Sequence, residues 1–144
     1  MYILGINAYH ADASAAIIFN GKLIAAVEEE RFTRIKHTAG FPSNAVRYCL
    51  QQAGIKIQDV SYVAIPRKRS AQLFRKLFWA IKTPGFAMRR ANVWQKFSSV
   101  KDEIAIACGV SKDDIKAEFH FVEHHVAHAA SAFYCSPHLE SAIL

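Results

Sequence analysis

The sequence has few cysteines and no long apolar run. Its three cysteines, Cys49, Cys108 and Cys135, are odd in number and widely spaced, without a CxxC pair. This pattern speaks against a disulfide framework and against a zinc knuckle, so we expect buried, reduced thiols. No apolar stretch approaches the roughly 20 residues needed to cross a bilayer. The chain start also lacks the features of a signal peptide, and we therefore expect a cytoplasmic protein.

Acidic residues are missing from one long segment. Residues 66–101 contain ten of the 18 Lys and Arg and no Asp or Glu, so the net charge of +6 originates there. Apolar and basic residues alternate in this segment at helical spacing, which predicts a basic, amphipathic helical insertion. Its candidate partners are a membrane surface, a nucleic acid and the protein itself. Because packing onto the same protein is the commonest case, we expect neither nucleic acid nor membrane as a partner.

The amino-terminal residues predict three antiparallel strands. Residues 3–6 are a short apolar run that ends near Asn7, and residues 13–19 and 22–27 are the next two runs. Between the last two lies Asn20-Gly21, the dipeptide that best accepts the positive φ of a two-residue hairpin turn.

Helix and strand patterns then alternate along the chain. We expect a helix from residue 43 that ends at Gly54, a strand over 60–65, a helix opened by a capping box at Ser99 and Asp102, a strand over 118–122, a helix over 124–134 and a last strand ending at Leu144. This order fits an α/β, RNase H-like mixed sheet in strand order 3-2-1-4-5 with flanking helices. Since the last strand is cut short, we expect residues 1–144 to be the amino-terminal portion of a longer domain.

The sharpest candidate for a binding site is the run from Glu123 to His128. On a helix, His124 and His128 are one turn apart, about 5–6 Å at Cβ, a spacing at which two imidazoles can share a metal ion. No Glu lies between them, which disfavours zinc-peptidase chemistry. A hydrogen-bonded histidine pair explains the spacing equally well, although the small residues that follow slightly favour a ligand. Two ligands do not complete a metal site, so further donors are expected beyond residue 144.

The second candidate is the polar loop of residues 7–14, which carries Asn7, His10, Asp12 and Ser14. A loop between two core strands is suited to a phosphate or another polar substrate, and a histidine can act there as a general base. The loop has no Gly-rich phosphate cradle, which weakens direct nucleotide binding. Turn formation explains Asp12 and Ser14 better, because such side chains cap turns. Only His10 stays open to both interpretations.

The third candidate is the charge-dense segment of residues 28–37, EEERFTRIKH. If the strand continues through the glutamates, they alternate between its faces, and one of them must point inward. That carboxylate then needs Arg31, Arg34 or Lys36 as its partner. The cationic cluster suits phosphate or carbamate oxygens, and a solvated edge of ion pairs is the alternative.

Three motifs, in this order and at similar spacing, resemble the NodU/CmcH carbamoyltransferase family. They are GINAYHADASAA, VEEERFTRIKH with GFP close behind, and HFVEHHVAHAASAF. The resemblance extends over residues 1–144 and is loosest in the basic segment. It implies an amino-terminal domain of the actin/Hsp70/sugar-kinase superfamily and a YrdC-like carboxy-terminal domain of the same chain as its partner.

The resemblance also implies an O-carbamoyltransferase reaction. ATP and carbamoyl phosphate would form carbamoyl-adenylate in the YrdC-like domain, and the carbamoyl group would pass to a hydroxyl of a small-molecule acceptor. His124 and His128 match the family's metal-binding histidines, with iron as the expected divalent metal. Aspartates beyond Leu144 would complete the metal shell. The identity of the acceptor is left open, and so is the possibility that the protein forms a homo-oligomer.

The two polar segments receive roles from the same resemblance. His10 matches the family's first-loop histidine and is the candidate catalytic residue. The candidate substrate-binding residues are Asn7, Asp12, Lys36 and His37. Asn7 stands where actins and sugar kinases have a magnesium-directing Asp, which speaks against the main alternative, a sugar-kinase-like or actin-like phosphotransferase. The remaining alternative is a non-enzymatic module that binds through its basic segment.

Overall fold

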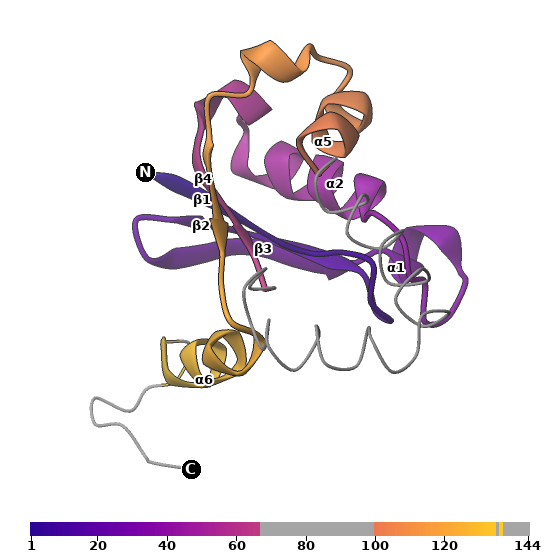
Figure 1. Cartoon of the computed structure of the whole chain (residues 1–144), viewed down its shortest axis with the longest axis vertical. Coiled ribbons are helices and arrows are strands. Elements are labelled where there is room, and N and C mark those ends of the chain that lie inside the picture. The colour runs from indigo at the N-terminus through magenta and orange to yellow at the C-terminus, as the bar shows by residue number, and fades with distance from the viewer. Residues whose placement is uncertain (67–99, 135, 137–144) are drawn as a thin grey trace, which may run out of the picture.

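A computed structural model describes residues 1–66, 100–134 and 136. Five strands form one mixed sheet with the neighbour order β3-β2-β1-β4-β5, as predicted (Figure 1). The strands are β1 Tyr2–Asn7, β2 Ser14–Phe19, β3 Lys22–Glu28, β4 Val60–Ile65 and β5 Glu118–Phe121. The helices are α1 Glu30–Thr33, α2 Ser43–Ala53, α5 Val100–Cys108 and α6 His124–Tyr134, with 3-10 turns η1 Ile57–Asp59 and η2 Lys112–Asp114.

The first three strands form the predicted antiparallel meander. β1 pairs with β2, and β2 pairs with β3, both antiparallel. Asn20 and Gly21 join β2 to β3 with φ angles of 47° and 82°, the two positive values that a type I′ hairpin requires. β4 then pairs parallel to β1, and β5 pairs parallel to β4. As a result, β1, β4 and β5 all end at the same edge of the sheet.

One face of the sheet holds the core. Alternate residues of β1, including Leu4 and Ile6, are buried against α2 and α5 together with Val63 of β4. Because side chains alternate along a strand, the residues between them face the other way. Burial of each such aliphatic side chain contributes about 1.5–3 kcal/mol, so this face supplies most of the apolar stabilisation.

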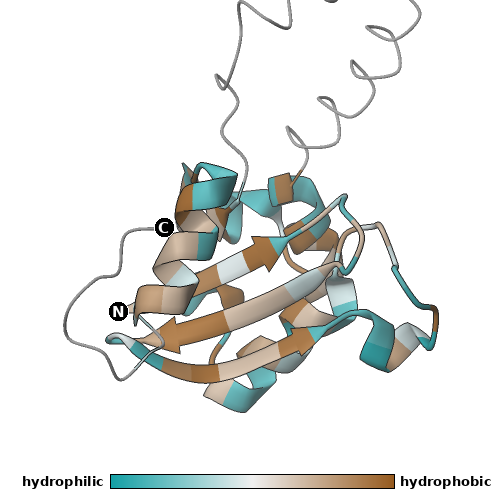
Figure 2. Cartoon of the chain, turned by 90° about the horizontal axis from the view of Figure 1, so that it is seen from below, coloured by the Kyte–Doolittle hydropathy of each residue, from teal (hydrophilic) through white to brown (hydrophobic). Residues whose placement is uncertain are grey.

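The second face of the sheet is mostly open and carries α6. Figure 2 looks onto it from below, with α6 in front of the strands and most of the sheet in view. No residue of α6, all of which is described, is buried. The core is therefore one-sided within the described part of the chain.

Both helices of the core face end as the sequence predicts. Gly54 follows α2 and Gly109 follows α5, each with a φ of 66°. In this left-handed conformation the Gly54 N–H closes the helix by donating to the Gln51 carbonyl at 3.0 Å.

The prediction for the glutamate run is wrong in two respects. β3 ends at Glu28, and Glu30 begins the short helix α1, so the strand alternation does not continue. Glu29 does point inward, with 4 % of its surface exposed. Its partners, however, are Asn44 and the backbone at the start of α2, not Arg31, Arg34 or Lys36. The unpaired N–H groups at a helix start compete successfully for a buried carboxylate.

Several predicted features lie outside the described residues. These are most of the basic segment 66–101, the Ser99 cap, Cys135 and the strand ending at Leu144. Cys49 and Cys108 are free thiols. Burial raises the pKa of the Cys49 thiol to about 11, which keeps it protonated. Among the described helices, none has both the length and the apolar character that a membrane crossing requires.

Candidate functional site

A cavity of about 800 Å³ lies between the open face of the sheet and α6. Its wall on the sheet side consists mainly of small residues from β1 to β4, among them Gly5, Ala16, Ala26 and Ala64. Small side chains at these outward positions leave the space that larger ones would fill. The cavity reaches the ends of β1 and β4, the place where open α/β sheets bind ligands.

Uncharged polar and histidine side chains line this cavity from β1, β2 and α6. Asn7 enters from the end of β1, Ser14 from the start of β2, and His124, His128 and Ser131 from α6. Asn7 and the two histidines are thus brought together from segments more than a hundred residues apart in the chain.

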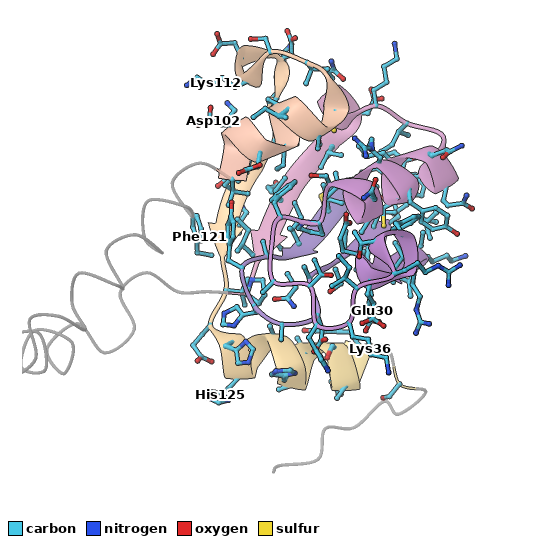
Figure 3. All side chains as sticks on the ribbon, turned by 90° about the vertical axis from the view of Figure 1, so that its right-hand side faces the viewer. Glu30, Lys36, Asp102, Lys112, Phe121 and His125 are labelled. Carbon is cyan, nitrogen blue, oxygen red and sulfur yellow. The ribbon has the colours of Figure 1, made fainter. Side chains whose placement is uncertain are left out.

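The two histidines have the helical spacing that the sequence predicts. Their Nε2 atoms are 3.1 Å apart, within hydrogen-bonding distance, as the alternative of a hydrogen-bonded pair also requires, with ring centroids at 4.5 Å and planes at 85°. The helix that carries them begins directly after β5, and the Glu123 carboxylate accepts from the Val126 N–H at 3.0 Å in its first turn. That hydrogen bond lowers the pKa of Glu123. His125 is not among the cavity-lining residues. In Figure 3 it lies at the side of α6 that faces away from the sheet.

His10 lies beside this pair. Its ring is nearly parallel to that of His124, with centroids 6.2 Å apart and an interplanar angle of 22°. The first loop and the histidine helix α6 therefore lie close together. Within residues 1–66 and 100–134, no three His, Cys, Asp or Glu side chains converge as a metal-binding group. A metal on His124 and His128 would take its other ligands from elsewhere.

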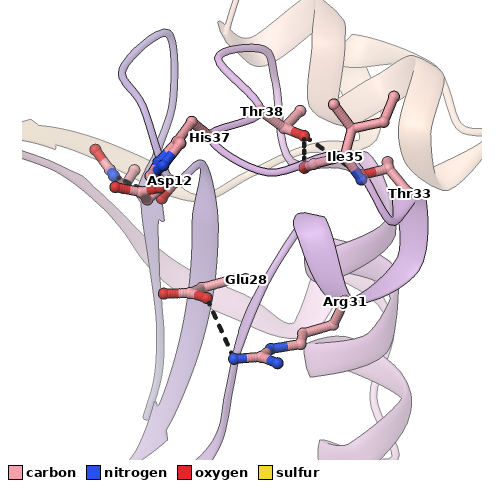
Figure 4. Close-up of polar contacts among 8 residues, drawn as sticks. Asp12, Glu28, Arg31, Thr33, Ile35, His37 and Thr38 are labelled. Atoms are coloured by element: carbon pink, nitrogen blue, oxygen red, sulfur yellow. Dashed lines mark hydrogen bonds and ion pairs between the residues drawn. The ribbon is translucent and has the colours of Figure 1, made fainter.

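Two segments meet beside His10: the His10 loop (residues 8–13) and the His37 segment (residues 34–42). The Asp12 carboxylate pairs with His37 Nδ1 at 2.9 Å (Figure 4). The backbone N–H groups of Tyr9 and Ala13 donate to carbonyls of the His37 segment at 3.0 and 3.1 Å. Asn7 Nδ2 donates to the Asp12 carbonyl at 3.1 Å. These contacts hold the two segments as one unit.

The structure separates the predicted substrate-binding residues into two groups. Asn7 lines the cavity, whereas Asp12, Lys36 and His37 are exposed and are not among its lining residues. Asp12 has a positive φ of 64° and holds a neighbouring segment, which agrees with its interpretation as a turn residue. Their roles toward a substrate stay predictions.

Two functional candidates were not predicted individually. Glu28 and Arg31 line the cavity on the β3 side and form an exposed ion pair with 3.9 Å between Arg31 Nη2 and Glu28 Oε2 (Figure 4). The charge-dense segment 28–37 indicated a polar site, but Glu28 and Arg31 reach the cavity only because the chain turns between β3 and α1. The small outward residues of the strands were the signal for the cavity itself.

The chain is similar to one protein-family model and to curated relatives from bacteria. The family model for the carbamoyltransferase N-terminus matches residues 2–144. An uncharacterized protein of Synechocystis sp. is 37% identical over 99% of this chain and 25% of its own length. The nodulation protein NolNO of Sinorhizobium fredii is 33% identical over 96% of this chain and 19% of its own length.

Among solved structures, YeaZ from Pseudomonas aeruginosa matches 94% of this chain and 50% of its own, at 14% identity and a TM-score of 0.46. The chain spans a quarter or less of the length of the two curated relatives.

Proposed function

Because this chain belongs to the carbamoyltransferase amino-terminal family, we propose that it supplies the acceptor side of an O-carbamoyltransferase. In the proposed reaction the carbamoyl group of carbamoyl-adenylate, made from ATP and carbamoyl phosphate, passes to a hydroxyl of a small molecule. The carbamoyl carbon gains a bond to the acceptor oxygen, the bond to the phosphate oxygen breaks, and AMP leaves. The YrdC-like domain of the same chain would supply the adenylate, in the cytoplasm.

One observation carries the proposal: His10, which is not itself a cavity-lining residue, stacks beside His124, and His124 lines the cavity together with His128. A cavity of about 800 Å³ is large enough for a small acceptor together with the reacting end of an adenylate. In this arrangement His10 is the group that takes the proton from the acceptor hydroxyl as its oxygen attacks.

The histidine pair fits a metal ion. Metal–imidazole bonds of about 2.0–2.1 Å place the two nitrogens of neighbouring ligands roughly 3.0–3.4 Å apart. The Nε2 atoms of His124 and His128 are 3.1 Å apart without any movement of the helix. Imidazole nitrogen suits iron as well as zinc. A metal there would act as a Lewis acid toward a carbonyl or phosphoryl oxygen.

The nucleotide product tests the proposed reaction. The full-length protein, given ATP, carbamoyl phosphate and a panel of sugars and other polyols, is expected to release AMP together with a carbamoylated product. A phosphotransferase would release ADP and a phosphorylated product instead. Formation of ADP without AMP, in mass-spectrometric analysis of the products, would overturn the proposal.

The phosphotransferase alternative is also less compatible with the first loop. Asn7 has a neutral side-chain amide, whose Nδ2 donates to the Asp12 carbonyl at 3.1 Å, at the position where a magnesium-directing carboxylate is needed.

A further inference from the structure

We propose that Glu29 is a positioning residue that sets the His10 loop and the His37 segment against each other. Its effect on turnover rests on the proposed function, whereas its effect on geometry does not. Among the residues that the structure describes, Glu29 is the buried charged side chain, with 4 % of its surface exposed. A buried carboxylate is retained only where hydrogen bonds replace its water, so its partners indicate its role.

Those partners lie at the start of α2. Glu29 Oε1 accepts from Asn44 Nδ2 at 2.6 Å and from the Asn44 N–H at 3.2 Å, and Oε2 accepts from the Ala45 N–H at 2.8 Å. The residue that precedes the helix is Pro42, and its side chain makes no capping hydrogen bond. Glu29 therefore caps α2 from a distant element, with a charge of the sign that a helix start favours.

The backbone of the same residue reaches the other two elements of the site. The Glu29 carbonyl accepts from the N–H groups of Phe32 and Thr33 at 3.0 and 3.1 Å, which opens α1. Its N–H donates to the Ala13 carbonyl at 2.8 Å, at the end of the His10 loop. One residue thus binds the end of the His10 loop, the start of α1 and the start of α2.

This arrangement has a consequence for the His37 segment. The segment runs from α1 to α2, so both of its ends are attached to Glu29. Along its length it accepts the N–H groups of Tyr9 and Ala13 through the carbonyls of Gly40 and Thr38. A shift of the α2 start would therefore move Gly40 and with it Tyr9, the neighbour of His10.

Glu29→Gln in the full-length protein tests this role. The variant keeps the shape but replaces one acceptor with an NH₂ group that faces N–H donors. We expect amide hydrogen exchange at Tyr9 and Ala13 to rise at least about tenfold, because hydrogen bonds to a charged group are lost. Turnover in carbamoyl transfer should fall with little change in acceptor KM, since Glu29 is not among the cavity-lining residues.

The matched control is Val46→Ala, which weakens α2 at a fully buried core position and removes none of the hydrogen bonds of the Glu29 side chain. The two variants are compared at temperatures that give equal global stability. A rise confined to Glu29→Gln supports a positioning role. An equal rise in both variants, or none in Glu29→Gln, overturns it.

Rescue provides a second readout. In the double variant Glu29→Gln with Asn44→Asp, the shortest hydrogen bond is reversed, because the introduced side-chain amide donates to the introduced carboxylate. We expect most of the protection at Tyr9 and Ala13 to return, and no return would contradict the proposal.

If Glu29→Gln fails to fold, Asn44→Ala removes one donor and is expected to raise exchange at the same two amides by a smaller factor; an unchanged rate there would refute the role. Absence of carbamoyl transfer in the unmodified protein would refute the proposed function alone, since the exchange comparison is independent of it.

Discussion

The two faces of the sheet are built from the same strands but serve different purposes. On β1, Leu4 and Ile6 are 0% and 1% exposed beneath α2 and α5, while Gly5 and Asn7 line the cavity on the other face. α2 buries four residues, and α6 buries none of its described residues. The core face thus supplies most of the buried apolar surface and the α6 face holds the candidate site, so substitutions on the two faces should have separable effects.

The largest effect on the α6 face is expected at His10. His10→Asn should lower kcat for carbamoyl transfer by about 10²–10⁴-fold, the usual contribution of a general base. Urea denaturation of the same variant should stay within about 0.5 kcal/mol of the parent, because the side chain is exposed. Full activity with an intact fold would remove His10 from the catalytic role.

On the core face the expected effect is on stability. Leu4→Ala should lower the free energy of unfolding by about 2–5 kcal/mol, since it leaves a hole in a fully buried site. Ile3→Ala, one position along the same strand and only half-buried, is the control and should cost less. Urea or guanidinium titration measures both; equal losses would mean that the two faces are packed alike.

Metal binding should distinguish residues within α6. His124→Ala and His128→Ala are each expected to lower metal affinity at least about tenfold, because each removes a direct ligand and second-shell losses alone reach that size. His125→Ala, outside the cavity lining, should retain the parent's metal content. Metal analysis and titration of the full-length proteins provide the measurement, and the same content in all variants would exclude the pair as ligands.

The smallest effect is expected at the exposed pair between the two site segments. Asp12→Asn removes the charge that faces His37, whose side chain is 75% exposed. Exposed ion pairs contribute about 0–1 kcal/mol, so thermal or urea unfolding should change by no more than that. A loss beyond about 2 kcal/mol would show that this contact belongs to the core face's network after all.

Much of the fold could be predicted because its signals are local. Asn20-Gly21 specifies a hairpin by backbone preference, and Gly54 specifies a helix end for the same reason. Period-two and period-3.6 patterns located β4 and α6 at the bounds that the structure has. His10 and His124 lie close together in the structure because they follow β1 and β5, strands that end at the same edge of the sheet.

The partner of Glu29, the cavity and the helix α1 were beyond such reasoning. Glu29 accepts a hydrogen bond from Asn44, which lies 15 residues further along the chain. A buried carboxylate needs a hydrogen-bonding partner, but either this amide or a nearby arginine could serve, so the sequence does not select between them. The choice depends on where α2 begins in space. Glu28 and Arg31 reach the cavity only because the chain turns between β3 and α1.

Local residue patterns predict the main helices and strands and the helical spacing of His124 and His128, because backbone preferences and apolar periodicity act over a few residues. The strand order followed from the rules that govern connections between strands. Which groups satisfy the buried carboxylate, and which small side chains enclose the cavity, becomes clear only in the folded arrangement. Those outcomes depend on distances between segments far apart in the chain, which no local pattern encodes.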